Sequence, residues 1–382
     1  MLLKKKKKNR NSLFLWSLVL VGGWWYCAFT PPSKAQNFEI ALPASQEISH
    51  QPYLTPICRD QLKDALSGNV GLMASLISQW DLDAELLESK GYAGIKRLPR
   101  ESFIRSQLLV RRLCVSTNKD KSATFLPQTY LATSFLLALT TPRQIAALPN
   151  GVRSLTQIFS KELTSQIPFD ISRYNAEKLF LSPPSMAFTA EFSHPIWKTI
   201  FNQQSIPFCV IKVPESPEAI GPTLVQIGQL IDRPLESELL ATFIEAALLA
   251  IDNQIWGLQE IWRRENRTPS ILFAQYHSQL TLPTARTLTG HLLKRSNLFS
   301  ANETESAEWA IPLRVEQLVQ MNPDCLIIST SMEKQSILKK NFTALARTKL
   351  VFVDDILQQF PSQYIVLAYY DLYNALAQVL PL

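Results

Sequence analysis

The sequence offers few residues that could perform catalysis. Its four histidines include no pair at metal-ligand spacing on one predicted element, which disfavours a bare metal-ion site. The chain contains no GxGxxG, GxxxxGKS/T, GxSxG or HExxH motif, and its 11 glycines leave few loops that could cradle a phosphate. A Ser/His/Asp arrangement stays open, but no pattern indicates one. We therefore expect a protein that is not an enzyme and carries no cofactor of its own.

Two glutamates occupy matching positions in a short internal repeat. The first copy reads NAEKLFLSPPSMAFTA and the second reads RVEQLVQMNPDCLIIST. The matched residues are Glu177, Leu179 and Pro184 in the first copy and Glu316, Leu318 and Pro323 in the second. Each copy predicts a helix that packs through its leucine, ends at the proline and leads into a strand. The paired carboxylates could meet a cationic partner, although acids also favour the first turn of a helix for local reasons.

Strands and helices alternate in two stretches of the chain, which predicts two α/β lobes with parallel sheets of the Rossmann-like kind. The strands expected in the first lobe are 123–126, 144–148, 185–190 and 207–213, and those expected in the second are 270–276, 324–330 and 349–355. Between them, residues 216–266 have helical periodicity with one break at Arg233-Pro234. This segment predicts a long helix that bridges the lobes.

The predicted organisation has five parts. Their boundaries are 1–35 for a signal peptide or anchor, 36–120 for a linker and small helical N-terminal region, 121–214 for the N-terminal lobe, 215–266 for the bridging helices and 267–382 for the C-terminal lobe. Within the second part, residues 36–55 are polar with two prolines, and the pattern from Cys58 to Ser116 is helical. The purpose of that helical region is open.

From about Ala123 to Leu382 the chain resembles the two-lobed periplasmic binding proteins of the cobalamin, iron-siderophore and haem ABC importers. The similar pieces are ATFLPQTYLATSFLLAL, SIPFCVIKVPESPEAIGPTLVQIGQLIDRP, VEQLVQMNPDCLIIST and KLVFVDDILQQFPSQYIVLAYYDLYNAL. The chain departs from the family pattern at Lys294-Arg295-Ser296-Asn297, where a glycine pair usually precedes the asparagine, and in its helical N-terminal region. The resemblance implies that Glu177 and Glu316 dock to arginines of a dimeric permease.

The resemblance also implies a ligand in the cleft between the lobes, lined by loops at the carboxyl ends of the strands. The candidate ligand-binding residues are Gln128, Thr129, Phe192 and His194 in the first lobe and Tyr276, His277, Trp309 and Phe360 in the second. Aromatic walls suit a large flat or chelate-type ligand. Trp309 stands where binding proteins of this class often carry an aromatic residue, although it could equally be a packing tryptophan.

His277 suggests a more specific possibility, because haem-binding relatives place a histidine near the end of the same strand. A neutral imidazole is a common iron ligand, and Tyr276 or His194 could supply a second one. A histidine in a polar loop is more often simply solvated. Haem ligation is therefore one alternative among several.

The N-terminus has the composition of an export signal. A lysine-rich stretch precedes the apolar run 13–29, Pro31-Pro32 breaks that run, and Ser33-Lys34-Ala35 offers a cleavage site before Gln36. We expect a cleaved signal and a periplasmic location, with a retained membrane anchor as the alternative. Residues 1–35 hold seven basic and no acidic residues, so 31 basic and 32 acidic residues remain in the rest of the chain. That balance gives no indication of nucleic-acid binding.

Four cysteines follow the expected signal. Cys209 and Cys325 lie in apolar runs and are expected to be buried small hydrophobes. Cys58 and Cys114 lie in polar helical stretches, where a disulfide is permitted in an exported protein but is not required. The sequence as a whole predicts the solute-binding component of an ABC importer, which carries a ferric siderophore, a cobalamin or haem. The alternative is a tethered or periplasmic scaffold protein with this fold and no transport role.

Overall fold

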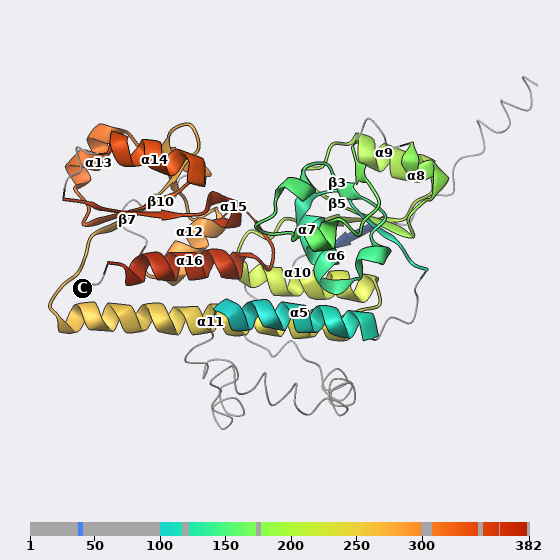
Figure 1. The fold of residues 1–382 in the computed structure, drawn as a ribbon, viewed down its shortest axis with the longest axis horizontal. Helices are drawn as coiled ribbons and strands as arrows, with labels where there is room; N and C mark the ends of the chain where they lie inside the picture. The colour runs from blue at the N-terminus through green and yellow to red at the C-terminus, as the bar shows by residue number, and fades with distance from the viewer. Residues whose placement is uncertain are drawn as a thin grey trace, which may run out of the picture.

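A computed structural model describes residues 37–40, 100–116, 122–172, 177–298, 308–342, 347–358 and 360–379. The predicted signal peptide and Cys58 lie outside these residues. Within the described part of the chain, no helix has both the length and the apolar character needed to cross a membrane. The described residues form two lobes that stand side by side on a long helix (Figure 1).

The first lobe is built on a parallel four-stranded sheet in the order β1-β6-β5-β2. Its strands are β1 (Asn37–Ile40), β2 (Phe125–Pro127), β5 (Met186–Ala190) and β6 (Phe208–Ile211). The sequence places β1 in a linker, but the structure pairs it with β6 at the edge of the sheet. Four residues in a proline-containing polar stretch give no strand signal, and the partner strand is about 170 residues away in sequence.

A second, smaller parallel pair in this lobe consists of β3 (Leu148–Pro149) and β4 (Asp170–Ile171). The expected strand 144–148 is therefore shorter than predicted, and Pro142–Gln144 form a single 3-10 turn. The helices of the lobe are α6 (Tyr130–Leu139), α7 (Lys161–Thr164), α8 (Lys178–Leu181) and α9 (Ile196–Gln203).

The second lobe contains a five-stranded sheet in the order β11-β10-β7-β8-β9. Its strands are β7 (Ile271–Tyr276), β8 (Leu280–Pro283), β9 (Ala310–Pro312), β10 (Cys325–Ser329) and β11 (Lys349–Val353). The three strands that the sequence predicts, β7, β10 and β11, are parallel. The sequence misses β8 and β9, which add an antiparallel edge. The helices are α12 (Leu288–Arg295), α13 (Val315–Met321), α14 (Met332–Asn341), α15 (Asp355–Gln358) and α16 (Ile365–Ala377).

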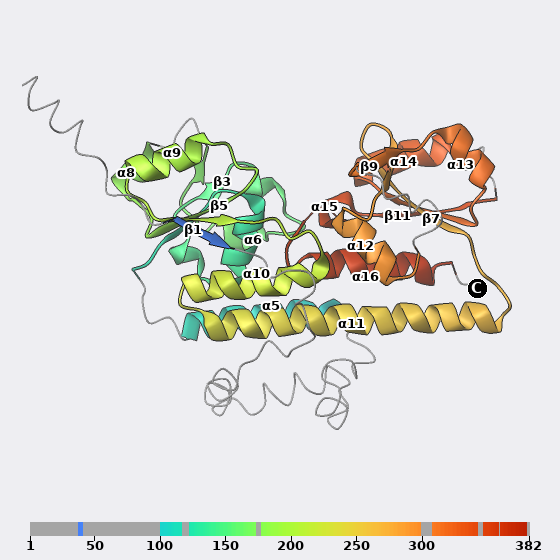
Figure 2. The ribbon, with the colours of Figure 1, turned by 180° about the vertical axis from the view of Figure 1, so that it is seen from behind.

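The bridge consists of α10 (Pro217–Leu230) and the 31-residue α11 (Pro234–Arg264). At 1.5 Å per residue α11 is about 46 Å long, and it runs beneath both lobes (Figures 1 and 2). The helix α5 (Arg100–Ser116) lies along α11 on the same side of the molecule. The guanidinium of Arg111 donates to the carbonyl of Leu137 in α6, at 3.1 and 3.2 Å. The predicted helix around 101–114 is therefore part of the body of the molecule.

The leucine and the proline of the internal repeat occupy equivalent places in both lobes. Leu179 and Leu318 are buried at 1% and 0% exposure in the core of their own lobe. Pro184 and Pro323 are buried and precede β5 and β10 by two residues each. The repeated leucine and proline are thus explained by packing and chain reversal, while the repeated glutamate is not.

Charged side chains connect the bridge to the second lobe. Arg295, at the end of α12, forms ion pairs with Glu218 of α10 and Asp252 of α11. Asp252 also accepts a hydrogen bond of 2.6 Å from the hydroxyl of Tyr369 in α16. Burial raises the pKa of Asp252, and the Arg295 charge offsets this only in part. For Glu218 the same burial is outweighed by Arg295 and by hydrogen bonds, so its pKa lies below the ordinary value.

Candidate ligand-binding site

A cavity of about 580 Å³ opens between the lobes, at the carboxyl ends of β2 and β5. Most of its lining comes from the first lobe, and the loop after α15 contributes the part that comes from the second. Figure 1 places α15 at the centre of the molecule, between the lobes. Open α/β sheets bind ligands in this position because loops and helix starts converge at the carboxyl edge.

The first wall is the turn from β2 into α6. The side chain of Thr129 caps α6 by accepting from the Ala132 N–H at 3.1 Å, which fixes the start of the helix beside the cavity. Gln128 follows β2, and its Oε1 accepts from the Thr189 hydroxyl at 3.4 Å. Tyr130 donates its hydroxyl to the carbonyl of Asn150 at 3.2 Å, so this wall is joined to the loop after β3.

The second wall is the loop between β5 and α9. Its cavity-lining residues are Phe192, Ser193, His194 and Trp197. The Ala190 N–H donates to Ser193 Oγ at 3.0 Å, and the Ile196 N–H donates to His194 Nδ1 at 3.2 Å. These short-range bonds shape the loop. Phe192 is 67% exposed, so its ring is available to a ligand.

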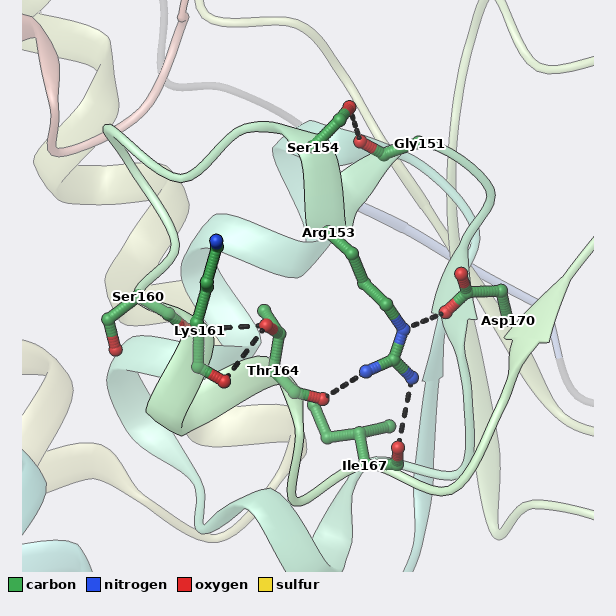
Figure 3. Close-up of polar contacts among 8 residues, drawn as sticks. All are labelled: Gly151, Arg153, Ser154, Ser160, Lys161, Thr164, Ile167 and Asp170. Atoms are coloured by element: carbon green, nitrogen blue, oxygen red, sulfur yellow. Dashed lines mark hydrogen bonds and ion pairs between the residues drawn. The ribbon is translucent and has the colours of Figure 1, made fainter.

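The third wall comes from the small sheet and contains Asn150 and Ser172 at its rim. Arg153 holds the adjoining segments together through contacts with Asp170, Thr164 and Ile167 (Figure 3). Its Nε donates to Asp170 at 2.7 Å, and its two terminal nitrogens donate to the carbonyls of Thr164 and Ile167. Because these bonds engage all three of its nitrogens, Arg153 serves the loop and not the cavity.

Gly151 has a close steric role in the same wall. Its φ of 91° lies in the left-handed region, and a Cβ there would stand 2.4 Å from the hydroxyl oxygen of Tyr130. The loop after β3 can therefore approach α6 only with glycine at this position.

The second lobe closes the cavity with Phe360 and Pro361. The ring of Phe360 stacks on that of Tyr130, with centroids 6.3 Å apart and planes 9° from parallel. It also meets Phe159 edge-on at 6.1 Å. Nearby, the amide of Gln363 donates to the Ser134 carbonyl of α6 at 2.9 Å. Aromatic and amide contacts thus join the two lobes directly behind the cavity.

Five of the eight predicted ligand-binding residues line this cavity. They are Gln128, Thr129, Phe192, His194 and Phe360. None of the described residues that line it is a lysine, arginine, aspartate or glutamate. The lining is therefore aromatic, amide and hydroxyl in character where the structure describes it.

The other three predicted residues are Tyr276, His277 and Trp309. They are not among the described residues that line the cavity, and their role in binding stays a prediction. His277 follows β7 and lies with its Nδ1 4.0 Å from Asp355 Oδ2, while Lys334 Nζ is 5.9 Å from the ring centroid of Tyr276. Trp309 is 63% exposed and precedes β9. In the sheet, Thr281 of β8 pairs with Gln275 of β7 on one side and with Pro312 of β9 on the other, so Pro312 is level with the end of β7. Trp309 precedes Pro312 by three residues and therefore lies roughly 10 Å back from the carboxyl edge of β7.

Several residues line the cavity that the sequence did not indicate. Tyr130 directly follows the predicted Thr129, and Trp197 lies one helical turn after His194, so local periodicity could have found both. Asn150 and Ser172 directly follow the short strands β3 and β4, which have no clear pattern of their own. Only their pairing places them at the cavity.

The two repeat glutamates are not among the described residues that line the cavity. Glu177 precedes α8 and Glu316 lies in the first turn of α13, and both are exposed. In Figure 1 these helices occupy opposite ends of the face that points away from α11. Exposed apolar side chains accompany them, including Leu181 at 89% and Val319 at 47% exposure.

The described cysteines are structural. Cys114, Cys209 and Cys325 are buried and form no disulfide with another described residue, and burial raises the pKa of the Cys209 thiol to about 12 and that of the Cys325 thiol to about 11. These thiols stay protonated and unreactive at neutral pH. The pairing of Cys114 with Cys58 stays a prediction, since Cys58 lies outside the described residues. The described residues also contain no cluster of three His, Cys, Asp or Glu that could hold a metal ion.

No known family profile matches the chain, and no curated protein does so either. Solved structures do match its fold. The periplasmic haem-binding protein HutB of Vibrio cholerae has a TM-score of 0.52 at 18% identity, over 66% of this chain and 98% of that one. A periplasmic haem-binding protein from Pseudomonas aeruginosa has 0.51 at 16%, over 66% and 92%. The siderophore-binding protein FhuD of Vibrio cholerae, bound to Fe³⁺-Desferal, has 0.51 at 12%, over 68% and 99%.

The chain therefore has the fold of the two-lobed periplasmic binding proteins, as the sequence predicts. The parallel sheets, the bridging helix and the cavity between the lobes are all features of that class. At these identities the similarity defines the fold and leaves the ligand open.

Proposed function

We propose that this protein is the solute-binding component of an ABC importer and captures a metal chelate or tetrapyrrole. The observation that carries the proposal is the cavity of about 580 Å³ between two lobes of a binding-protein fold. Its volume lies within the roughly 300–1,000 Å³ usual for small-molecule sites. Aromatic side chains and neutral polar groups around it provide the apolar area and the few directed contacts that such sites use.

The proposed location is the periplasm, reached through the N-terminal export signal. The fold supports this, because the solved structures that share it are of periplasmic proteins. A partner permease follows from the same role, since a periplasmic carrier must deliver its ligand to a membrane component.

A ligand panel tests the proposal. The purified protein is mixed with haem, cobalamin and ferric siderophores, and the melting temperature is measured by differential scanning fluorimetry. At least one ligand should raise the melting temperature by several degrees, because a ligand present at 100 times its Kd stabilises the folded state by about 2.7 kcal/mol. A panel with no effect would contradict transport and favour the scaffold alternative.

We further propose that Glu177 and Glu316 dock the protein to the permease. Their exposure, their matching repeat positions and their place at opposite ends of one face support this role. Two like charges at fixed separation suit a two-fold symmetric partner with one cation in each half.

The docking proposal predicts that the double variant Glu177→Lys/Glu316→Lys loses uptake of the ligand in cells by at least tenfold. Reversed charges would repel the cations of the permease, while the cavity stays unchanged. Ligand affinity of the purified variant should equal that of the parent. Glu265→Lys, at the end of α11, is a matched control that should transport normally. Normal uptake by the double variant would overturn the docking role alone.

A further inference from the structure

The side chains that line the cavity differ in whether they can coordinate a metal. Among the described lining residues, only His194 has an imidazole and only Tyr130 has a phenol, while the indole nitrogen of Trp197 has no lone pair for a metal. Haem iron requires such axial ligands from the protein, whereas a hexadentate chelate fills all the positions of its own metal. The hydrogen bonds of these two residues therefore distinguish the possible ligand classes.

The direction of the hydrogen bond made by the His194 ring does not suit a metal ligand. Its Nδ1 accepts a hydrogen bond from the Ile196 N–H at the start of α9. In a neutral imidazole the proton then resides on Nε2, which makes that nitrogen a donor. A ligating histidine has the opposite arrangement, because it donates its second ring N–H to a carboxylate or carbonyl and presents a lone pair to the metal. The hydrogen bond from the Ile196 N–H therefore opposes ligation of a metal by His194.

Tyr130 is engaged in a different way. Its hydroxyl donates to Asn150 O, and its ring stacks on Phe360, so coordination would require both contacts to change. The other two candidate ligands, Tyr276 and His277, are not among the described lining residues. The Nδ1 of His277 faces Asp355 at 4.0 Å, and its carbonyl accepts from Lys334 at 2.6 Å.

The polar groups of the cavity form a set of donors. Gln128 directs its Oε1 to Thr189, which leaves its amide N–H groups for a ligand. The Oγ of Ser193 accepts from Ala190 N, so its hydroxyl proton is available to donate. With the Nε2 of His194 these make three donors around an aromatic floor.

We infer that the ligand is a coordinatively saturated metal chelate with acceptor oxygens on its surface, held by Gln128, Ser193 and His194 as hydrogen-bond donors and not by ligation of its metal. Phe192 and the Tyr130–Phe360 stack cover its apolar face. This inference rests on the proposed function and narrows its ligand class to complexes such as trihydroxamates of Fe³⁺. Ligands with open axial positions, such as haem, are not held through iron at this site.

A comparison of ligands that carry different metals tests the inference directly. Ferric desferrioxamine and its exchange-inert Cr³⁺ counterpart are titrated into the full protein, and ferric haem and cyanocobalamin are titrated separately, with calorimetry and visible spectra as readouts. The two hydroxamate chelates should bind with Kd values within about threefold of one another, because the protein contacts only their organic surface. Haem should show no spectrum of a ligated complex.

Variants at His194 provide the second readout. His194→Gln keeps a donor near the Nε2 position, so its affinity for the chelate should stay within about twofold, whereas His194→Ala should lose roughly fivefold. If His194 instead ligated the metal of the chelate, both variants would lose that bond, and their affinities would fall alike. Haem bound with a ligated spectrum that His194→Ala abolishes would overturn the inference and leave the proposed function intact. Failure of every ligand to bind would overturn the proposed function itself.

Discussion

Arg295 forms ion pairs with two partly buried carboxylates, Glu218 and Asp252. It connects two carboxylates on the bridging helices to the second lobe, at the place where the sequence departs from the family pattern. Each of the three side chains is partly buried, at 20% to 33% exposure, so water screens the pairs only in part. A buried charge without its partner is costly, and the ion pairs are therefore best tested by removing the shared cation.

Arg295→Met should lower the free energy of unfolding by about 2–4 kcal/mol, since Glu218 and Asp252 would lose their common partner. Urea denaturation measures the change. Arg263→Met is the matched control, because Arg263 pairs with Glu260 at 60% exposure and should contribute less than about 1 kcal/mol. Equal stability of parent and Arg295→Met would show that the network is not stabilising.

The pKa of Glu218 predicts how this network responds to acid. Because its pKa is lowered in the folded state, its contribution is present above the ordinary carboxyl value and is lost as the pH falls through the folded-state value. The raised pKa of Asp252 acts in the opposite direction, so Glu218→Gln isolates the first effect. That variant should lose less stability than the parent between pH 5 and pH 3, as urea titrations at each pH would record.

At the scale of elements, the turn between α10 and α11 controls how the bridge folds back on itself. A Cβ on Gly228 would stand 2.0 Å from Ser237 Oγ and 2.8 Å from the Arg233 carbonyl. Asp232, with φ of 56°, completes the reversal. The close approach of the two helices thus requires glycine at this position.

Gly228→Ala should therefore destabilise the protein by about 1–3 kcal/mol through overpacking. Gly257 in α11 supplies the control, since a Cβ there meets nothing within 4 Å. Gly257→Ala should be neutral or stabilising by up to about 1 kcal/mol, as expected for alanine in a helix. Thermal unfolding of both variants measures the difference. If Gly228→Ala melts with or above Gly257→Ala, the helices do not need this close approach.

Elements with strong local patterns were predicted well. The apolar runs that became β5, β6, β7, β10 and β11 and the periodic segments of α10 and α11 carry their signal in adjacent residues. The missed strands have weak local patterns: β1 lies in a polar stretch and pairs with the distant β6, while β8 and β9 are short strands at the antiparallel edge beside β7. A short strand without an apolar run of its own gives little signal in the sequence.

At the scale of the whole molecule, the cavity exists because α11 holds the lobes at a fixed separation while the contacts of Phe360 and Gln363 join them. The arrangement leaves the Glu177 and Glu316 helices at the two ends of one face. The ligand site and the proposed docking face are consequently separate, so a carrier of this shape could bind and dock through different residues.

The residue order alone determined the two α/β lobes, the bridging helix, the repeat and five of the cavity-lining residues, because each depends on the pattern of neighbouring side chains or on a strand end. Only the tertiary structure decided that Asn150 and Ser172 join the cavity and that Arg153 turns away from it. It also decided that the Nδ1 of His194 accepts a hydrogen bond and that Trp309 lies back from the carboxyl edge. Hydrogen-bond polarity and strand register arise from partners far apart in the chain or from the exact turn geometry, and residue types do not encode either one locally.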